Sequence, residues 1–365
     1  MPLFKTDNES IKRAAEVLAG GGLVAFPTET VYGLGANVFN PVALAKIFEV
    51  KNRPYFDPLI VHISCMDMLE ITADISQLDS TSRKRLAVLT EKLWPGPLTL
   101  VLPKRKTIPD LATSGLSTVA VRLPDHETAR QLIALSGRPV AAPSANPFGY
   151  LSPTRAEHVA DTLGDKIDMI LDGGPSNVGV ESTVLDVCGG QPRILRPGGV
   201  PAETIEALIG PIVTGTTGGH AGGHAGDLAG DHVGDIVGGI TSPGQLKSHY
   251  APHALLSVYD SEIPGNLPGE PGSVLLFFDG ASRDKWLSTR KTALAGDGTE
   301  QKAAIVVLSE TGSALEAAAR LFETLHDLDR PDIKRIYARL APENGLGTAI
   351  NDRLRRAADK TESGA

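Results

Sequence analysis

The sequence predicts an α/β protein made of two domains joined by a glycine-rich segment, and three observations support this. The chain has 365 residues, enough for two separate cores. Short apolar runs typical of strands alternate with stretches of helical periodicity. Between 210 and 240 glycine dominates, a composition that cannot support a packed core. We therefore expect a first domain over residues 1–210, a flexible linker over 211–256 and a smaller second domain over 257–365.

Composition and charge argue against several classes of protein. Apolar residues make up 41% and charged residues 21% of the chain, as in an ordinary globular protein. The net charge of −8 argues against a broad basic face that grips nucleic acid. Cys65 and Cys188 lack CxxC spacing, so we expect no disulfide framework and no zinc site, but buried thiols in a reducing cytosol. Charged residues precede the first apolar run, and no run approaches the ~18 residues of a membrane span. We expect a cytoplasmic protein without a membrane segment.

The elements of the first domain follow from the spacing of apolar residues. Helices are predicted where these recur every three or four positions: 8–18, 41–50, 80–93, 125–135, a helix opened by a capping box at 154–157, and 201–209. Strands are predicted at short apolar runs: 23–26, 59–63, 98–102, 118–123, 139–142, 168–171, 184–187 and 193–195. Some strands follow one another directly, which favours a mixed, twisted sheet over a regular doubly wound one.

The second domain shows a simpler alternation. Apolar runs at 274–278, 304–308 and 333–337 are separated or followed by helical segments, the clearest at 314–325 and 344–358. This order predicts a small parallel sheet with Rossmann-like connections. It contains no nucleotide-binding fingerprint, so regulation, gating of a cavity and partner docking all remain open for this domain.

Polar residues gather where predicted strands and helices end. An apolar run stops at Pro27 and is followed by Thr28, Glu29 and Thr30, while Lys51 and Arg53 end a helix just before a proline. Such ends suit a polar site, and cations on an elbow suit a polyphosphate. Taken separately, the same residues also fit a capped strand and a solvated helix end.

Three later strand ends repeat this pattern. Arg122 ends one strand. It is either an outward-facing edge residue or a residue whose guanidinium binds a carboxylate through two hydrogen bonds. Ser144 and Asn146 follow Pro143 in what is, taken alone, a simple turn, and Arg196 ends another strand before Pro197. Convergence of these ends predicts a pocket for an anionic ligand. The absence of GxxxxGK[ST] and GxGxxG argues against a P-loop or an ordinary dinucleotide fold.

The linker carries three histidines that need a separate interpretation. His220, His224 and His232 have the chemistry of metal ligands, but a glycine-rich coil presets no coordination geometry. We therefore favour a structural tether and predict no resident metal site.

Four ordered motifs and the linker ends resemble the YrdC/Sua5 family, the threonylcarbamoyl-AMP synthases, in its two-domain Sua5 form. The motifs are Pro27-Thr28-Glu29-Thr30-Val31-Tyr32-Gly33-Leu34, Lys51-x-Arg53, Ser144-x-Asn146 and Arg196-Pro197-Gly198. The resemblance covers about residues 8–210, and Ser242-Pro243-Gly244 with His249-Tyr250-Ala251-Pro252 resembles that family's interdomain linker. It implies a twisted α/β sheet with a positively charged cavity, followed by a C-terminal domain.

The resemblance implies a nucleotidyltransferase that forms L-threonylcarbamoyl-adenylate and pyrophosphate from L-threonine, bicarbonate or CO2, and ATP. The product serves N6-threonylcarbamoylation of adenosine 37 in tRNA through a downstream transfer complex. It also implies site residues: catalytic Lys51, Arg53, Ser144 and Asn146; threonine-binding Thr30, His62, Arg122, Ala142 and Ser182, with Tyr32 as a wall; ATP-binding Arg53, Asp57, Thr118, Ser144, Ser152, Arg196 and Tyr250. In such proteins the linker folds over the site and acts as a lid.

One position departs from the family's pattern. The family commonly has asparagine where this chain has Asp57, and a carboxylate near a triphosphate would repel it. Asp57 either faces away, pairs with a nearby cation or helps to hold Mg²⁺. Mg²⁺ is expected to arrive with ATP, because no carboxylate cage is evident.

Two other functions compete with this reading. A non-catalytic YrdC-like protein would bind double-stranded RNA or tRNA in the same cavity, which the acidic net charge and the intact motifs disfavour. A carbamoyltransferase of the hydrogenase-maturation type would need an acylphosphatase domain and zinc-finger cysteines, and neither is evident in the sequence.

Overall fold

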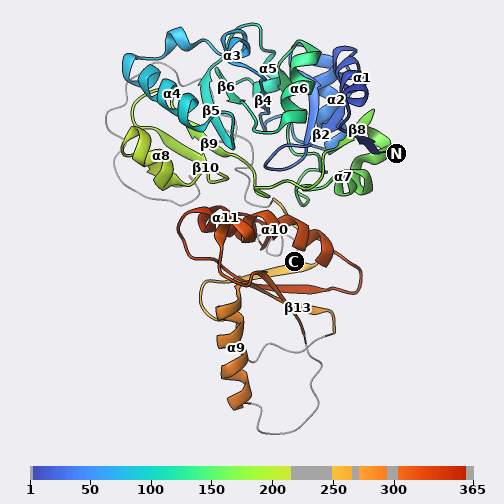
Figure 1. The fold of residues 1–365 in the computed structure, drawn as a ribbon, viewed down its shortest axis with the longest axis vertical. Helices are drawn as coiled ribbons and strands as arrows, with labels where there is room; N and C mark the ends of the chain where they lie inside the picture. The colour runs from blue at the N-terminus through green and yellow to red at the C-terminus, as the bar shows by residue number, and fades with distance from the viewer. Residues whose placement is uncertain (1–2, 215–248, 265–270, 294–302, 359–365) are drawn as a thin grey trace.

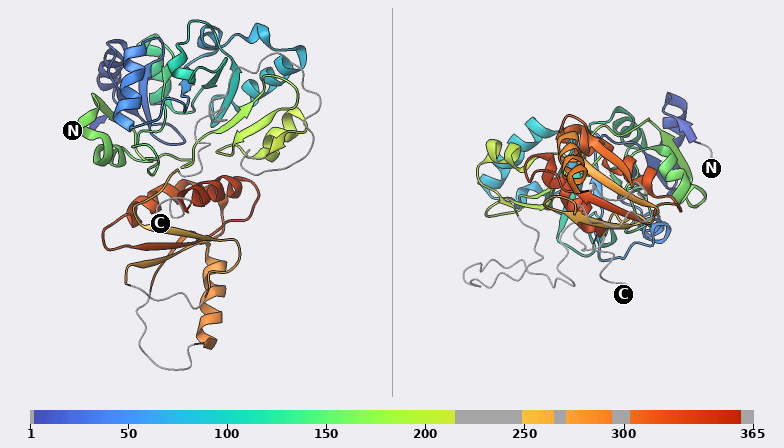
Figure 2. Two further views of the ribbon diagram at one scale, coloured as in Figure 1. Left: turned by 180° about the vertical axis from the view of Figure 1, so that it is seen from behind. Right: turned by 90° about the horizontal axis from the view of Figure 1, so that it is seen from below.

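The computed structural model describes residues 3–214, 249–264, 271–293 and 303–358. Two α/β domains are stacked along the long axis of the molecule, and helices α10 (Ala314–Leu328) and α11 (Leu346–Ala358) of the second domain face the first (Figures 1 and 2). Helix α9 (Gly280–Ala293) lies at the far end of the second domain.

The first domain is built on a mixed sheet of eleven strands in the order β1-β8-β2-β3-β7-β4-β6-β5-β9-β10-β11. The strands are β1 (Leu3–Lys5), β2 (Val24–Phe26), β3 (Gly33–Asn37), β4 (Ile60–His62), β5 (Leu98–Pro103), β6 (Thr118–Arg122), β7 (Val140–Ala141), β8 (Met169–Asp172), β9 (Thr183–Asp186), β10 (Arg193–Arg196) and β11 (Val213–Thr214). The sheet contains both parallel and antiparallel pairs, which confirms the predicted mixed sheet.

Eight α-helices surround this sheet among the described residues. They are α1 (Asn8–Ala19), α2 (Pro41–Lys51), α3 (Met66–Thr72), α4 (Ser80–Leu93), α5 (Asp110–Thr113), α6 (Glu127–Ser136), α7 (Ala156–Leu163) and α8 (Ala202–Ile209). The amphipathic ones match the predicted ranges closely, because their apolar stripes pack on the sheet.

Helix α2 illustrates how local sequence fixes the ends that matter for function. The Asn40 side chain accepts hydrogen bonds from the first-turn amides, and Pro41 stands at the first position. Asn52 ends the helix in the left-handed region, with φ of 50°. This turn directs Arg53 back toward the sheet rather than into solvent, where a simple helix end would have left it.

Several local predictions are wrong. Residues 33–37 form a strand that is missing from the predicted strands. At Gly35 a Cβ would lie 2.8 Å from both Phe26 and Val140, so only glycine lets these strands pair. Helix α7 begins without a side-chain cap, so the capping box is absent. Cys65 is exposed and Cys188 half-buried, so neither is the fully buried thiol we expected.

The second domain contains a four-stranded, entirely parallel sheet in the order β12-β15-β13-β14, which confirms the predicted parallel connection. Its strands are β12 (Leu255–Tyr259), β13 (Ser273–Asp279), β14 (Ala304–Ser309) and β15 (Arg335–Arg339). Strand β12 was not predicted, because it is short and half exposed.

Strand pairing shows where the two sheets end and begin along the chain. Strand β11 pairs with β10, so the first sheet continues to Thr214, and the second sheet already starts at Leu255. Residues 215–248 lie outside the described part of the chain, and with them His220, His224, His232 and Ser242-Pro243-Gly244.

The two domains share one hydrophobic cluster. Val31, Leu151 and Val180 of the first domain pack in the same cluster as Leu321 and Phe322 of α10. Gly179 allows this approach, because a Cβ there would lie 2.4 Å from the backbone of α10. The stacking of the domains is therefore a packed interface.

Candidate functional site

A cavity opens where several strand ends of the first domain meet the start of the second. Its lining combines hydroxyls, guanidinium groups, imidazoles and one carboxylate: Thr28, Thr30, Val31, Tyr32, Gly33, Arg53, Ile60, His62, Arg122, Ala142, Pro143, Ser144, Glu181, Ser182, Arg196, His249 and Tyr250. The predicted convergence of polar strand ends at a pocket is present.

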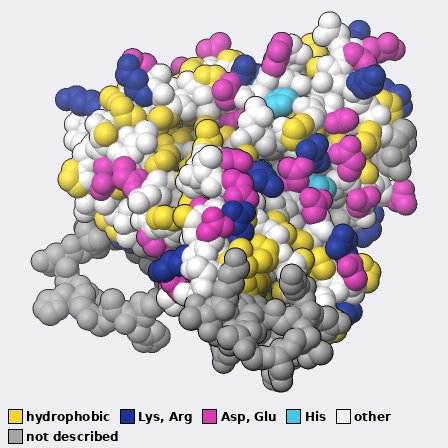
Figure 3. All heavy atoms as spheres, turned by 60° about the horizontal axis from the view of Figure 1, so that its bottom comes forward, with side chains coloured by type: hydrophobic (Ala, Val, Ile, Leu, Met, Phe, Trp, Pro, Cys, Tyr) yellow, Lys and Arg dark blue, Asp and Glu magenta, His cyan; other side chains and the backbone are white. Residues whose placement is uncertain are grey.

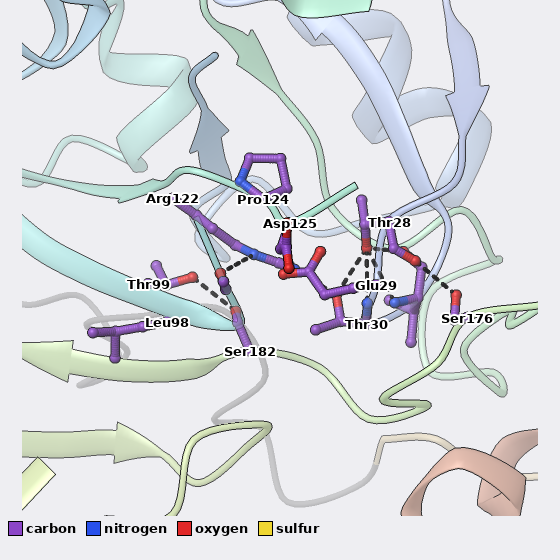
Figure 4. Close-up of polar contacts among 12 residues, drawn as sticks. Thr28, Glu29, Thr30, Leu98, Thr99, Arg122, Pro124, Asp125, Ser176 and Ser182 are labelled. Carbon is purple, nitrogen blue, oxygen red and sulfur yellow. Dashed lines mark hydrogen bonds and ion pairs between the residues drawn. The ribbon is translucent and has the colours of Figure 1, made fainter. Parts of the chain in front are cut away.

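Arg122 lies at the carboxyl end of β6, directly beside His62 of β4 in the parallel register. Its side chain is almost fully buried, and Nη2 lies 2.7 Å from a carboxylate oxygen of Glu29. Nη1 donates a hydrogen bond of 2.8 Å to the Thr30 hydroxyl (Figure 4). Arg122 is thus held in the cavity by a counter-ion and is not an outward-facing edge residue.

The two threonines of the first motif form an ordered chain of hydroxyls. Thr28 Oγ1 donates to the Val31 carbonyl at 2.6 Å, so the Thr30 hydroxyl must be the donor in the 2.9 Å contact between Thr28 and Thr30. Thr30 Oγ1 therefore accepts from Arg122 while donating to Thr28 (Figure 4). This fixes a hydroxyl oxygen beside the guanidinium.

His62 is a neutral imidazole at neutral pH. Burial, followed by the nearby charge of Arg122, lowers its pKa to about 3. Its ring packs edge-on against Phe26, and Nδ1 has no hydrogen-bond partner within the described chain. A neutral ring here adds no positive charge and offers a polar atom to a ligand.

The cavity wall also contains Ser182 and Arg196, which contact each other. The Ser182 hydroxyl lies 2.7 Å from the Thr99 hydroxyl, and Arg196 Nη2 donates to the Ser182 carbonyl at 2.9 Å (Figure 4 shows the Ser182–Thr99 contact). Arg196 ends β10, which pairs with β9 just after Ser182. The paired strands position both residues.

Arg53 reaches the cavity from the elbow after α2. Its guanidinium forms a buried ion pair of 2.8 Å with Asp57 and donates to the carbonyls of Asp57 and Pro58. Its Cζ lies 5.9 Å from the Phe148 ring centroid. Of the three alternatives for Asp57, the structure supports pairing with a cation.

Lys51 is buried behind the cavity wall and does not line it. Its ammonium donates to the main-chain carbonyls of Ser144, at 2.5 Å, and of Asn146. Burial, together with Arg53, lowers its pKa well below the usual value. The Asn146 amide in turn donates to the Pro147 and Tyr150 carbonyls. Lys51 therefore fixes the Ser-Ala-Asn turn that presents Ser144.

Tyr250 and His249 extend from the linker into the cavity. Tyr250 is 1% exposed and has a φ of 64°, in the left-handed region that a tyrosine rarely adopts. Burial raises its pKa, and burial lowers the pKa of His249 to about 3. The segment around residue 250 therefore closes one side of the cavity.

Most predicted site residues meet here, but a few do not line the cavity. Thr30, Arg53, His62, Arg122, Ala142, Ser144, Ser182, Arg196 and Tyr250 all line it. Ser152 contacts it indirectly, because its hydroxyl donates to Glu181. Thr118 starts β6, four positions before Arg122, and pairs with Pro103. Its side chain belongs to the other end of that strand.

Sequence reasoning missed several contributors. Glu29 lies within the first motif, and it is the counter-ion of Arg122, a pairing that the motif does not indicate. Glu181 directly precedes the predicted Ser182 and lines the cavity. Arg353 of α11 contacts Glu181 from 172 positions away, a pairing for which a single sequence carries no local signal.

The donor set of the cavity does not form a metal cage. Within the described residues, no group of three or more His, Cys, Asp and Glu side chains is arranged to hold a metal ion. Asp57 is paired with Arg53 and Glu181 with Arg353. Nor is any helix of the described chain long and apolar enough to cross a membrane.

Comparison with protein families assigns both halves of the chain. Residues 16–198 match the Sua5/YciO/YrdC family model, described as telomere recombination. Residues 200–359 match the model described as threonylcarbamoyl-AMP synthase, C-terminal domain.

Individual relatives match over nearly the whole length. Threonylcarbamoyl-AMP synthases of Pyrococcus abyssi and Bacillus subtilis are each 40% identical, covering 95% and 97% of this chain and 93% and 94% of their own. The crystal structure of Pyrococcus abyssi Sua5 complexed with L-threonine is 37% identical, with a TM-score of 0.78 and 98% coverage of both chains. The similarity thus includes the cavity, the linker ends and the second domain.

Proposed function

Because this chain belongs to the two-domain Sua5 family of threonylcarbamoyl-AMP synthases, we propose that it joins L-threonine, bicarbonate or CO2, and ATP into L-threonylcarbamoyl-adenylate and pyrophosphate. The observation that carries this proposal is the gathering of Arg53, Arg122 and Arg196 around hydroxyls in one cavity. The reaction brings a carboxylate, a carbamate and a triphosphate together, and these anions need fixed cations.

The chemistry consists of two bond-forming steps. The neutral amine of threonine attacks the carbon of bicarbonate or CO2, forming an N–C bond with loss of water or a proton. A carbamate oxygen then attacks the α-phosphorus of ATP, and the bond to the β-phosphate oxygen breaks, so that pyrophosphate leaves. The protein contributes mainly by orienting the reactants and offsetting their charge.

We assign the threonine end of the cavity to Arg122, Thr30, His62 and Ser182, with the main chain at Ala142. The Arg122 guanidinium suits a carboxylate, and the adjacent Thr30 oxygen suits an amine or hydroxyl of the amino acid. The neutral ring of His62 lets the ammonium group of threonine approach without repulsion. Tyr32, whose hydroxyl donates to the Gly174 carbonyl, supports a wall of this end.

We assign the phosphate end to Arg53, Arg196 and the turn carrying Ser144, with Lys51 holding that turn. Ser152, Asn146 and Tyr250 support the same end. Thr118 lies at the start of β6, so it contributes only if the nucleotide extends to that end of the strand. Mg²⁺ is proposed to arrive on the triphosphate. The described residues form no cage of side chains for it.

The alternative of a non-catalytic RNA-binding protein is less well supported. On the face shown in Figure 3, basic and acidic side chains are intermingled, whereas an RNA-binding face gathers basic ones. The proposed enzyme would act in the cytoplasm and pass its product to a complex that modifies tRNA. Its own contact with tRNA would be weak at most.

One assay tests the reaction. The protein is incubated with ATP, Mg²⁺, labelled bicarbonate and each amino acid, and pyrophosphate release is followed. Release that needs both threonine and bicarbonate is expected. Tight tRNA binding without any release would instead favour the RNA-binding alternative.

The variant Lys51→Ala is expected to abolish turnover. It removes the ammonium group that bonds the Ser144 and Asn146 carbonyls, so the turn that carries Ser144 is no longer held in place. Loss of at least about 100-fold in kcat/KM is expected from such misplacement. Lys92→Ala serves as a control, because Lys92 is exposed at the end of α4. Normal kinetics in Lys51→Ala would contradict the assignment.

The variant Arg122→Ala is expected to raise the KM for threonine with a smaller effect on the KM for ATP. A loss of about tenfold to 100-fold fits removal of a charge-assisted carboxylate contact. The measurement is a steady-state titration of each substrate in turn. If only the KM for ATP increased, the threonine end and the phosphate end of the cavity would have to be exchanged.

A further inference from the structure

The second domain contributes one fully buried cation to the edge of the cavity. Arg353 lies on α11, the helix that faces the first domain (Figure 1), and its side chain is 0% exposed. Nε lies 2.7 Å from Oε2 of Glu181, and Nη2 donates to the Pro197 carbonyl at 3.0 Å. A buried arginine without such partners would be strongly destabilising, so these contacts define its place.

The same guanidinium also supports the linker tyrosine. Its Cζ lies 5.1 Å from the centroid of the Tyr250 ring, a distance typical of a cation–π contact. Tyr250 keeps a backbone conformation that is unfavourable for a tyrosine, which persists only when its surroundings hold it. Arg353 is one of the side chains that hold it. Phe322 is another, with its ring centroid 5.6 Å from that of Tyr250.

Charge explains why this contact matters for an anionic substrate. Glu181 is the one carboxylate among the cavity-lining residues of the described chain. Burial alone would raise its pKa, but Arg353 and Arg196 outweigh burial and lower it to about 2, so Glu181 is ionised. An ionised carboxylate would repel a triphosphate unless a cation stays beside it.

We propose that Arg353 of the second domain is a positioning residue for the nucleotide end of the cavity: it neutralises Glu181 and holds Tyr250 and Pro197 in place. This deepens the proposed function and rests on it for the identity of the anion. It gives the second domain a defined task, because without that domain Glu181 loses its ion pair with Arg353.

The test measures binding and not turnover. Isothermal titration calorimetry follows α,β-methylene-ATP, whose α–β bridge cannot be cleaved, with Mg²⁺ and the full-length protein. Arg353→Gln is expected to weaken binding at least about tenfold, as when one partner of a buried charge pair is removed. Threonine affinity, measured the same way, should change less than about twofold, because Arg122 is paired with Glu29 and not with Glu181.

A double variant separates two effects of Arg353: its charge beside Glu181 and its packing against Tyr250. Adding Glu181→Gln to Arg353→Gln removes the unpaired carboxylate, so binding of the analogue should recover most of its loss. Arg355→Gln is the matched control on the same helix, because Arg355 is half exposed and pairs with Asp260 and Glu343 outside the cavity. It should bind the analogue like wild type.

Two results would overturn the proposal: Arg353→Gln binding the analogue as tightly as Arg355→Gln, or the double variant remaining as weak as the single one. If Arg353→Gln does not unfold cooperatively, Arg353→Lys carries the test. It keeps the charge beside Glu181, so it should bind the analogue nearly as tightly as wild type, and a loss of about tenfold in it would overturn the neutralisation of Glu181. Wild-type protein that binds the analogue yet releases no threonine-dependent pyrophosphate would refute the proposed reaction and leave this inference standing.

Discussion

At the scale of single residues, the cavity is organised by charges that neutralise one another before any substrate arrives. Arg122 forms an ion pair with Glu29, Arg53 forms one with Asp57, and Arg353 forms one with Glu181. Each pair is buried, so each carboxylate sets how much positive charge its arginine offers to an anion. Arg53 and Arg122 were predictable, because Arg53 stands beside a proline and Arg122 ends a short apolar run. Their counter-ions were not, since pairing is a property of the folded chain. Arg353 lies within a helix of the second domain and was not predicted.

Asp57 offers the clearest test at this scale. In Asp57→Asn, the Arg53 guanidinium keeps its bonds to the Asp57 and Pro58 carbonyl positions but loses its counter-charge. The KM for ATP is expected to fall by about twofold to tenfold, because Arg53 then offers a full charge to the phosphates. The threonine KM is the internal control. A higher KM for ATP would show that Asp57 assists the nucleotide.

At the scale of elements, close backbone approaches decide where the strand ends meet. Strands β9 and β10 pair with an irregularity just before Arg196, and the chain then returns along the start of β9. Gly198 allows this return: a Cβ there would lie 2.3 Å from the Glu181 carbonyl and 2.4 Å from the Thr183 amide. Long amphipathic helices such as α1 and α4 were predictable from periodicity. Two- and three-residue strands such as β1 and β11 were not, because their pairing depends on partners far along the chain.

The variant Gly198→Ala is therefore expected to displace Glu181, Ser182 and Thr183 together. Overpacking of this kind costs about 1–3 kcal/mol of stability, and kcat/KM should fall because Ser182 and Arg196 move apart. Thermal unfolding and steady-state kinetics measure the two effects. Gly189→Ala is the matched control, because a Cβ at Gly189 meets nothing within 4 Å. Equal behaviour of both variants would show that the close approach is not needed.

At the scale of the whole molecule, neutral histidines sit where the domains meet. The rings of His158 in α7 and His326 in α10 stack at 3.8 Å, and His326 Nε2 lies 3.1 Å from the Ser152 carbonyl. Burial, followed by the charge of His326, lowers the pKa of His158 to about 3. The charged groups facing this pair are Arg155, Glu323, Asp161, Asp327 and the Asp329–His253 pair. Two domains and a parallel second sheet were predictable, but this interface was not.

These histidines predict a pH dependence of stability. A histidine whose pKa is lowered from 6.5 to about 3 on folding binds fewer protons in the native state. Its stabilising effect is complete above pH 6.5 and is lost as the pH falls from 6.5 toward 3. The melting temperature should therefore decrease between pH 7.5 and 5.

The variant His158→Phe keeps an aromatic ring against His326 without a titrating group, so its melting temperature should decrease less over that pH range. Differential scanning fluorimetry at matched ionic strength measures both proteins. His62 and His249, whose pKa values are also lowered to about 3, leave a residual dependence in the variant. A pH profile identical to wild type would exclude His158 as a contributor.

The connection between Tyr250 and the second sheet sets a mechanical limit on how the cavity can open. Strand β12 begins at Leu255, and the five intervening peptide steps reach at most about 18 Å when fully extended. Tyr250 cannot leave the cavity much farther than that unless the second domain travels with it. Product escape would then be coupled to a collective displacement of a whole domain, a motion of microseconds to milliseconds. Its rate depends on solvent friction, so a viscous co-solvent should slow turnover in proportion if escape limits it.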